Sequence, residues 1–264
     1  MNRIDQAFKK LKKRKEKAFI AFITAGYPNL HVTEQLVLSF EKAGVDIVEL
    51  GVPFSDPLAD GKTIQAASQQ ALQHHITLEK IFQMVKRIRT RSQIPIALMT
   101  YYNPVFHLGE EKFMARAKSV GVDGVIVPDL PPEEAASLSK LARKKSIATV
   151  FFLSPTTTPS RMKKIVDAST GFIYYVSVTG ITGTSQTILA QQIKKQVTAA
   201  RRLTAKPVCV GFGVSDARQV KAVARLADGV IVGSAIIRAI AKNKGKKNLI
   251  QNVSRFVAQL AKAV

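Results

Sequence analysis

Short apolar runs, rich in β-branched residues, alternate along the chain with longer segments whose apolar residues recur every three or four positions. The short runs predict strands and the longer segments predict amphipathic helices. The predicted strands cover residues 19–24, 47–51, 94–100, 124–127, 148–153, 172–176, 208–210 and 229–232, and the predicted helices include 32–43, 78–89, 112–120, 132–144, 186–203 and 216–225. Turns rich in glycine, proline or aspartate follow the strands.

Repeated strand–helix units favour parallel pairing, because parallel strands need long crossover connections. Eight such units predict an α/β fold, a (β/α)8 TIM barrel, which takes about 250 residues. The 264 residues fit a single domain over 1–264, with an open doubly wound sheet as the alternative. An extra N-terminal helix over 4–13 has Ile4, Ala7, Phe8 and Leu11 on one face, and we expect it to cap the barrel floor.

Three segments, each made of a predicted strand and the residues that flank it, resemble one another: "AGVDIVELG" (43–51), "VGVDGVIVPD" (120–129) and "LADGVIVGS" (226–234). In each, a small residue and an aspartate precede an apolar strand. An aspartate in this position is typical of a tight turn between a helix and a strand. The repetition supports a barrel assembled from similar units.

Composition narrows the class of protein. Hydrophobic residues make up 46% of the chain, yet no apolar run reaches the length of about 20 residues that a membrane helix needs. Charges interrupt the N-terminal segment, so it is not read as a secretory signal. Cys209 is the only cysteine and lies in a predicted strand, which excludes an intrachain disulfide and indicates an inert core thiol. We expect a cytoplasmic protein without a membrane partner.

The formal net charge of +22 raises the question of nucleic acid binding. Two basic runs stand out, "KKLKKRKEK" (9–17) and "KNKGKK" (242–247). Neither contains aromatic residues that could stack on bases, and no nucleic-acid motif is present. We interpret the charge as a solvated surface that can attract an anionic substrate or acidic partner, and we expect no nucleic acid partner.

Glu49 stands inside a predicted buried strand. If Val48 and Leu50 face the outer helices, alternation points Glu49 into the barrel, near the catalytic carboxyl ends of the strands. No Lys or Arg lies in any predicted strand to neutralise it. Burial without a cation should raise the pKa of the carboxyl, so that it can both give and take a proton near neutral pH.

Three further aspartates lie just beyond strands. Asp60 is either a second functional carboxylate or the N-cap of the helix that starts near residue 61. Asp56, before a proline, has the pattern of a turn residue, and Asp129 that of a helix cap. His31 and His107 are expected in loops, and no spacing of His, Cys, Asp or Glu predicts a metal site.

Glycine-bearing turns follow the last three strands: "TGITG" (179–183), "GFGV" (211–214) and "GSAI" (233–236). Loops after strands seven and eight, with a short extra helix, recurrently bind phosphate in this barrel. Glycine lets backbone N–H groups approach the anion, and Ser234 could add a hydroxyl donor at the start of a helix over 235–240. Alternatively, the glycines only permit tight turns between strand and helix, and these turns bind no ligand.

Seven motifs occur in the order and spacing of one known family: "FITAGYP", "ELGVPFSDPLADG", "TYYNPVF", "VPDLP", "TGITG", "GFGV" and "GSAI". The chain closely resembles the tryptophan synthase α-subunit family from end to end. The resemblance implies cleavage of indole-3-glycerol phosphate to indole and glyceraldehyde 3-phosphate without a cofactor. It also implies a pyridoxal-phosphate-containing β subunit as partner in an α2β2 complex.

The resemblance also implies residue roles. Glu49 would be the catalytic acid/base, in a buried position. Asp60 would be the carboxylate that holds the indole N–H, in a position more exposed to water. The lid after strand six would hinge near Gly180 and Gly183. The implied substrate contacts are Phe22, Met99, Tyr101, Asp129, Tyr174, Thr182, Gly183, Phe212, Gly213, Gly233 and Ser234, and the implied partner contacts are Pro53 and Asp56. A stand-alone lyase and a non-catalytic activator of a β subunit remain alternatives.

Overall fold

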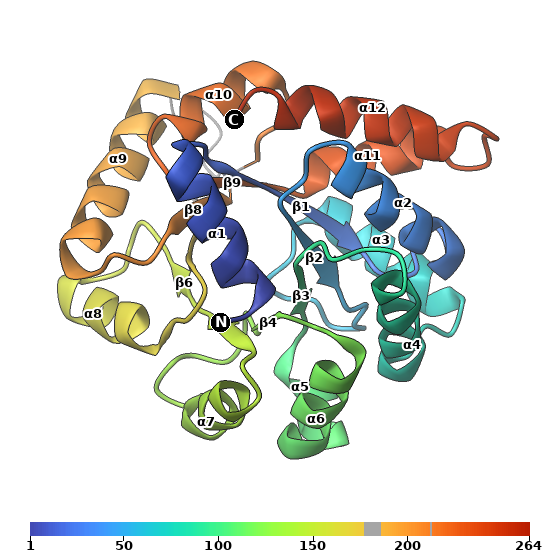
Figure 1. The fold of residues 1–264 in the computed structure, drawn as a ribbon, viewed down its shortest axis with the longest axis horizontal. Helices are drawn as coiled ribbons and strands as arrows, with labels where there is room; N and C mark the ends of the chain where they lie inside the picture. The colour runs from blue at the N-terminus through green and yellow to red at the C-terminus, as the bar shows by residue number, and fades with distance from the viewer. Residues whose placement is uncertain (177–185, 212) are drawn as a thin grey trace.

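A computed structural model describes residues 1–176, 186–211 and 213–264 (Figure 1). Within these ranges nine parallel strands form a nearly closed barrel surrounded by helices, as predicted for a (β/α)8 fold. The strands are β1 (Ala18–Thr24), β2 (Ile47–Gly51), β3 (Ile96–Met99), β4 (Gly124–Ile126), β5 (Ala148–Val150), β6 (Phe152–Leu153), β7 (Ile173–Val176), β8 (Val208–Gly211) and β9 (Gly229–Val232).

The order of neighbouring strands is β5-β4-β3-β2-β1-β9-β8-β7-β6. The strand predicted over 148–153 is therefore two short strands that meet at Phe151. β5 pairs with β4, and β6 pairs with β7, so the chain changes partner at this point. The Phe151 carbonyl still accepts a hydrogen bond from the Tyr174 amide at 3.1 Å, which holds the two edges of the sheet together.

The helices lie outside the strands, except for α1 at the floor (Figure 1). They are α1 (Arg3–Arg14), α2 (Leu30–Lys42), α3 (Lys62–Gln73), α4 (Leu78–Arg89), α5 (Tyr102–Leu108), α6 (Glu110–Val120), α7 (Ala136–Lys144), α8 (Pro159–Ala168), α9 (Gln186–Leu203), α10 (Ala217–Ala224), α11 (Ser234–Asn243) and α12 (Leu249–Ala261). None in the described ranges is both long and apolar enough to cross a membrane.

Two predictions about local structure were wrong. His31 lies in α2 and His107 in α5, not in loops. The N-cap of α2, Asn29, accepts a hydrogen bond from the Val32 amide and starts the helix earlier than the apolar pattern indicates. The short helix α5 follows the carboxyl end of β3 directly, with Tyr101 as its N-cap residue.

The barrel interior is a separate apolar cluster that α1 closes from below. Ile4, Phe8 and Leu11 of α1 are buried against interior side chains such as Ile20 and Ile47. The helix approaches the sheet so closely that a Cβ atom at Gly124 would lie 2.8 Å from the Cδ1 atom of Ile4. The expected role of the N-terminal helix as a cap on the floor is confirmed.

The three aspartates of the repeated segments join neighbouring strands at this floor. The carboxylate of Asp46 accepts from the Phe19 amide at 2.8 Å, that of Asp123 from the Ile96 amide at 3.0 Å, and that of Asp228 from the Val208 amide at 3.0 Å. In each case the carboxylate before one strand bonds to an adjoining strand. The repeated aspartate thus sets the strand starts in register.

Asp123 also pairs with two cations, of which Arg89 is buried. Its side chain is 3% exposed and pairs with Arg89 of α4 at 2.8 Å and with Arg3 of α1 at 2.9 Å. Arg89 is itself only 9% exposed, and it donates to the carbonyls of Gly121 and Ile94. One carboxylate therefore connects two helices to the start of two strands.

Replacing Asp123 by alanine should lower the free energy of unfolding by about 3–5 kcal/mol, because Arg89 would remain buried without its counter-ion. Denaturant unfolding of the purified chain measures this change. Asp167→Ala is the matched control: its pair with Lys163 is exposed, so the loss should stay below about 1 kcal/mol. Equal losses in the two variants would show that the Asp123 network does not stabilise the floor.

Candidate active site

Glu49 lies near the carboxyl end of β2 with its side chain completely buried. Val48 and Leu50 pack in the outer core, whereas Ile47 belongs to the interior cluster, so alternation turns Glu49 inward as expected. Neither carboxyl oxygen has a hydrogen-bond partner among the described residues. Among the described residues, no hydrogen-bonding group and no cation therefore pairs with this fully buried carboxyl.

Burial raises the pKa of Glu49 from 4.5 to about 8. At neutral pH the carboxyl is thus mainly protonated and close enough to its pKa to exchange protons in both directions. Tyr174 of β7 lies close by: burial, and then the charge of Glu49, raises the pKa of its phenol well above the usual value. Cys209 is a buried free thiol in the interior cluster, as predicted.

Asp60 sits in the loop after β2, in contact with Tyr101. The Tyr101 hydroxyl donates to its Oδ2 atom at 3.2 Å and accepts from the Ala59 amide at 2.9 Å. Burial raises the pKa of Asp60 to about 6, while the hydrogen bond from Tyr101 opposes the rise. Asp60 is partly exposed whereas Glu49 is fully buried, as the expected contrast requires, and Asp60 is mostly ionised at neutral pH.

The two readings of Asp60 are now separated. Gly61 is the N-cap of α3 and no side chain caps that helix, so Asp60 is not the capping residue. Asp129 does bond to a helix start, but to that of α5: both carboxylate oxygens accept from the Tyr102 amide, at 2.9 and 3.1 Å. Asp56 lies exposed in the β2–α3 loop.

Phe22 links the strand that carries Glu49 to the last glycine turn. A Cβ atom at Gly51 would lie 2.6 Å from its Cζ atom, and one at Gly233 would lie 3.1 Å from its Cδ1 atom. The ring therefore fills space that only glycine leaves open at the end of β2 and at the start of α11. Among the other predicted pocket residues, Met99 and Tyr174 border the interior cluster.

The turn after β9 forms the start of α11. Gly233 is the N-cap of this helix, no side chain caps it, and Ser234 is its first residue. Backbone N–H groups at such a helix start, together with the helix dipole, suit an anion. Gly213 is exposed in the turn after β8. The predicted residues Gly180, Thr182, Gly183 and Phe212 lie outside the described part of the chain.

The motifs alone did not single out some neighbours of the site. Thr24 of β1 is 1% exposed, and its hydroxyl has no hydrogen-bond partner among the described residues. It is two positions after Phe22 and pairs in register with Gly51. Strand alternation from Phe22 was the signal that could have identified it. Phe54 stacks on Tyr101 with ring centroids 5.1 Å apart, a contact that loop sequence does not reveal.

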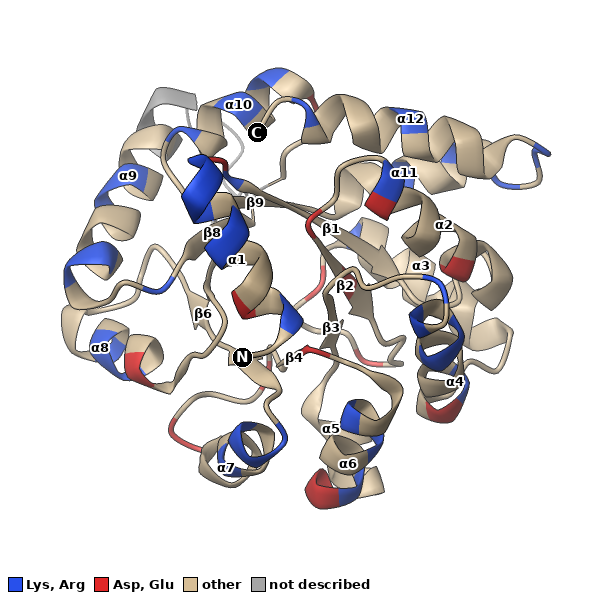
Figure 2. Cartoon of the chain, viewed as in Figure 1, with Lys and Arg blue, Asp and Glu red and all other residues tan. Residues whose placement is uncertain are grey.

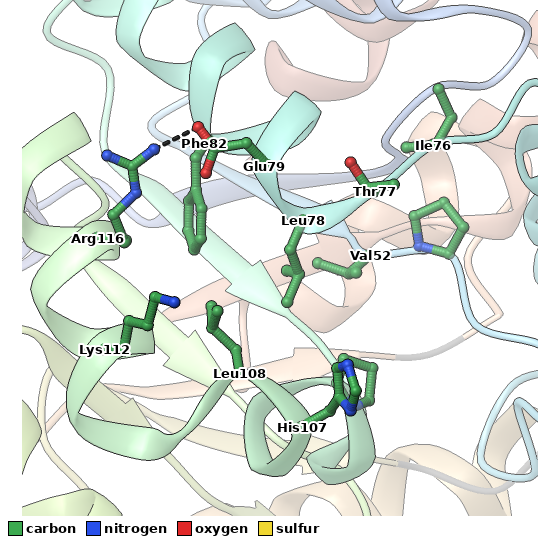
Figure 3. A pocket seen from close by; sticks show the side chains of 12 residues that line it. Val52, Ile76, Thr77, Leu78, Glu79, Phe82, His107, Leu108, Lys112 and Arg116 are labelled. Carbon is green, nitrogen blue, oxygen red and sulfur yellow. Dashed lines mark hydrogen bonds and ion pairs between the residues drawn. The ribbon is translucent and has the colours of Figure 1, made fainter.

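Beside the site, Pro53 borders a largely apolar hollow of about 430 Å³ between α4, α5 and α6 (Figure 3). Val52, Leu78 and Leu108 contribute to its wall, and the ion pair of Arg116 with Glu79 lies at one side. Two large apolar residues on neighbouring segments are exposed to solvent, Leu58 at 92% and Phe106 at 69%. This apolar surface adjoins the Pro53 loop.

No cluster of three or more His, Cys, Asp or Glu side chains capable of holding a metal occurs in the described ranges. The fold, with a fully buried carboxyl near the carboxyl ends of its strands, is that of a (β/α)8-barrel enzyme.

The chain belongs to the tryptophan synthase alpha chain family, whose model matches residues 8–264. It is 48% identical over 260 residues to the tryptophan synthase alpha chain of Geotalea daltonii, covering 98% of each chain. Tryptophan synthase subunit alpha from Legionella pneumophila superposes with a TM-score of 0.92 at 36% identity, over 100% of this chain and 98% of that chain.

A crystal structure of tryptophan synthase from M. tuberculosis matches with a TM-score of 0.90 at 30% identity, over 100% of this chain and 99% of that one. Membership of the family makes this protein a lyase of tryptophan biosynthesis. The barrel predicted from the repeated strand–helix units is confirmed.

The raised pKa of Glu49 should make stability depend on pH in a defined direction. A carboxyl whose pKa is 4.5 unfolded and about 8 folded stabilises the fold most at low pH, and this contribution is lost as the pH rises through that window. Glu49→Gln cannot titrate. The free energy of unfolding of this variant, minus that of the parent, should therefore increase by up to about 1.4 kcal/mol for each pH unit between pH 5 and 8.

Urea unfolding at several pH values measures this difference. Glu134→Gln on the exposed surface is the control, and its difference from the parent should be flat with pH. A flat difference for Glu49→Gln as well would show that the buried carboxyl has an ordinary pKa.

Proposed function

We propose that this chain, as one domain over 1–264, cleaves indole-3-glycerol phosphate to indole and D-glyceraldehyde 3-phosphate by a retro-aldol reaction. The observation that carries the proposal is the buried, unpartnered carboxyl of Glu49 near the end of β2. The family is one of lyases in tryptophan biosynthesis. This is the lyase step that such an acid can serve.

The proton balance of the reaction suits a single group with a pKa of about 8. Protonated Glu49 gives its proton to C3 of the indole ring, which turns the ring into a leaving group. The bond between C3 and the glycerol carbon then breaks, and its electron pair restores the aromatic ring. The hydroxyl on that carbon loses its proton as the aldehyde forms, and Glu49 takes a proton back. The acid is regenerated at the end of the cycle.

Asp60 supplies the opposite electrostatic partner. With a pKa of about 6 it is mainly a carboxylate at neutral pH, so it can accept a hydrogen bond from the indole N–H and stabilise positive charge on the protonated ring. The Tyr101 hydroxyl, which donates to Asp60 Oδ2, holds this carboxylate in place. Phe22, Met99, Asp129 and Tyr174 are proposed to shape the rest of the substrate site.

The phosphate group is proposed to bind at the start of α11. Gly233 and Ser234 offer backbone and hydroxyl donors there, and Gly213 follows the neighbouring strand. By resemblance, the proposed substrate contacts also include Thr182, Gly183 and Phe212, which lie outside the described residues. The net charge of +22 favours approach of the phosphorylated substrate.

The proposed partner is a tryptophan synthase β subunit in an α2β2 complex, with pyridoxal phosphate in the β subunit and no cofactor in this chain. Pro53 and Asp56 are proposed contacts. The exposed side chains of Leu58 and Phe106 support this face, because large apolar residues exposed to solvent on adjoining segments can mark interaction sites. A cytoplasmic location fits the single, free and buried cysteine.

Glu49→Gln should abolish indole release from indole-3-glycerol phosphate, lowering kcat by at least about 100-fold, since the amide cannot donate and recover the proton. Indole formation is measured with and without added β subunit. Glu134→Gln controls for the loss of one negative charge. Retained turnover in Glu49→Gln would rule out the proposed acid.

The same assay separates the alternatives. A high rate for the chain alone, unchanged by β subunit, would favour a stand-alone lyase. If the parent chain forms no indole but still activates the β subunit, the non-catalytic alternative would hold.

Leu58→Asp should weaken association with the β subunit by about tenfold or more, because burying the new carboxylate at the contact costs several kcal/mol. Sedimentation or light scattering of the mixed subunits measures association. Leu203→Asp is the matched control, since Leu203 is an exposed leucine, 45% accessible, at the far end of α9. Equal behaviour of the two variants would place the interface elsewhere.

A further inference from the structure

The second basic run, 242–247, forms part of a groove on the outside of the barrel. The groove has a volume of about 620 Å³ and lies between α11, α12 and the start of α10. Four cationic side chains line it: Arg238, Lys242, Lys246 and Arg255. None of the other lining residues is acidic. Figure 2 shows basic residues at the turn that joins α11 to α12, and α12 itself carries Arg255.

These cations have no counter-ion in the described part of the chain. Each of the described ion pairs involves other residues. Asp216, which follows the lining residue Ser215, uses its Oδ1 atom to accept from the amides of Arg218 and Gln219. Arg238 and Lys242 are four residues apart on α11, an arrangement of like charges that destabilises a helix. A multivalent anion in the groove would relieve this repulsion.

Besides the cations, the groove offers hydrogen-bonding and apolar groups. Asn252 of α12 donates to the Oδ1 atom of Asn243 at 2.9 Å, and Asn243 donates to the Ala239 carbonyl at 2.9 Å. These bonds join the two helices and leave the Asn252 carbonyl oxygen able to accept. Phe256 is half-buried in the wall, and Ala235 and Ala239 provide apolar surface. An aromatic ring, an amide and four cations thus share one hollow.

We propose that this groove binds an organic polyphosphate of the nucleoside triphosphate class. Its volume lies within the range of about 300–1,000 Å³ for small-molecule sites. Four cations match the charge of a triphosphate, and arginine can hold phosphate oxygens with two parallel hydrogen bonds. The base would lie on Phe256. The site involves a part of α11 beyond Gly233 and Ser234, and it does not depend on the proposed lyase reaction.

Isothermal titration of the full chain with ATP, AMP and inorganic triphosphate tests this assignment. ATP should bind with a stoichiometry of one. AMP should bind more weakly because it has fewer charges, and inorganic triphosphate more weakly because it has no ring. Arg238→Gln with Arg255→Gln should weaken ATP binding by at least about tenfold, the effect of losing charge-assisted hydrogen bonds. Phe256→Leu should reduce ATP binding to the level of inorganic triphosphate.

Lys140→Gln with Arg143→Gln is the matched control, because it removes two positive charges from α7, where they line a different hollow. This control should bind ATP as the parent does. Arg238→Lys with Arg255→Lys keeps the charge and should retain most of the binding, which guards against a folding defect in the glutamine pair.

Three results would overturn the proposal. The first is no ATP binding at millimolar concentration. The second is an equal loss in the groove and control pairs, which would indicate diffuse attraction to net charge. The third is binding of inorganic triphosphate or single-stranded DNA as tightly as ATP with no effect of Phe256→Leu, which would exclude recognition of a nucleoside.

Discussion

The site depends on the burial of the Glu49 carboxyl without a neutralising partner. Among the described residues, neither a cation nor a hydrogen-bond donor pairs with it. A carboxyl in this setting stays protonated because ionising it inside an apolar barrel costs several kcal/mol. The surrounding strands keep it in that setting. Interior side chains come from every strand, and α1 seals the floor beneath them. Burial thus keeps on Glu49 the proton that we propose for C–C cleavage.

The carboxylates at the two ends of the barrel have different hydrogen-bond and ion-pair partners. At the floor, Asp46, Asp123 and Asp228 bond to backbone amides of adjoining strands, and two of them also hold basic side chains. At the other end, within the described part of the chain, Glu49 has no such partner and Asp60 accepts from one tyrosine hydroxyl. Carboxylates that stabilise the fold are therefore paired, whereas those proposed for chemistry are left underpaired. This contrast separates structural from functional acids within one sequence.

Much of this arrangement could be predicted from residue patterns. Strand alternation placed Glu49 inside, and the helical spacing of Ile4, Phe8 and Leu11 placed α1 against the floor. The bond from Tyr101 to Asp60 could not be predicted, because two loops must fold before these side chains meet. The break at Phe151 was also missed, since a change of strand partner leaves no mark on an apolar run. Periodicity reports burial, whereas contacts between loops depend on tertiary structure.

The ring of Phe22 has a consequence for the size of the molecules that fit. It touches the end of the strand that carries Glu49 and also the turn where α11 begins. Because a rigid ring spans these two points, the gap between the proposed proton donor and the proposed phosphate-binding start of α11 cannot close or widen easily. The enzyme should therefore discriminate by linker length, accepting a three-carbon bridge between an aromatic ring and a phosphate while rejecting shorter and longer homologues.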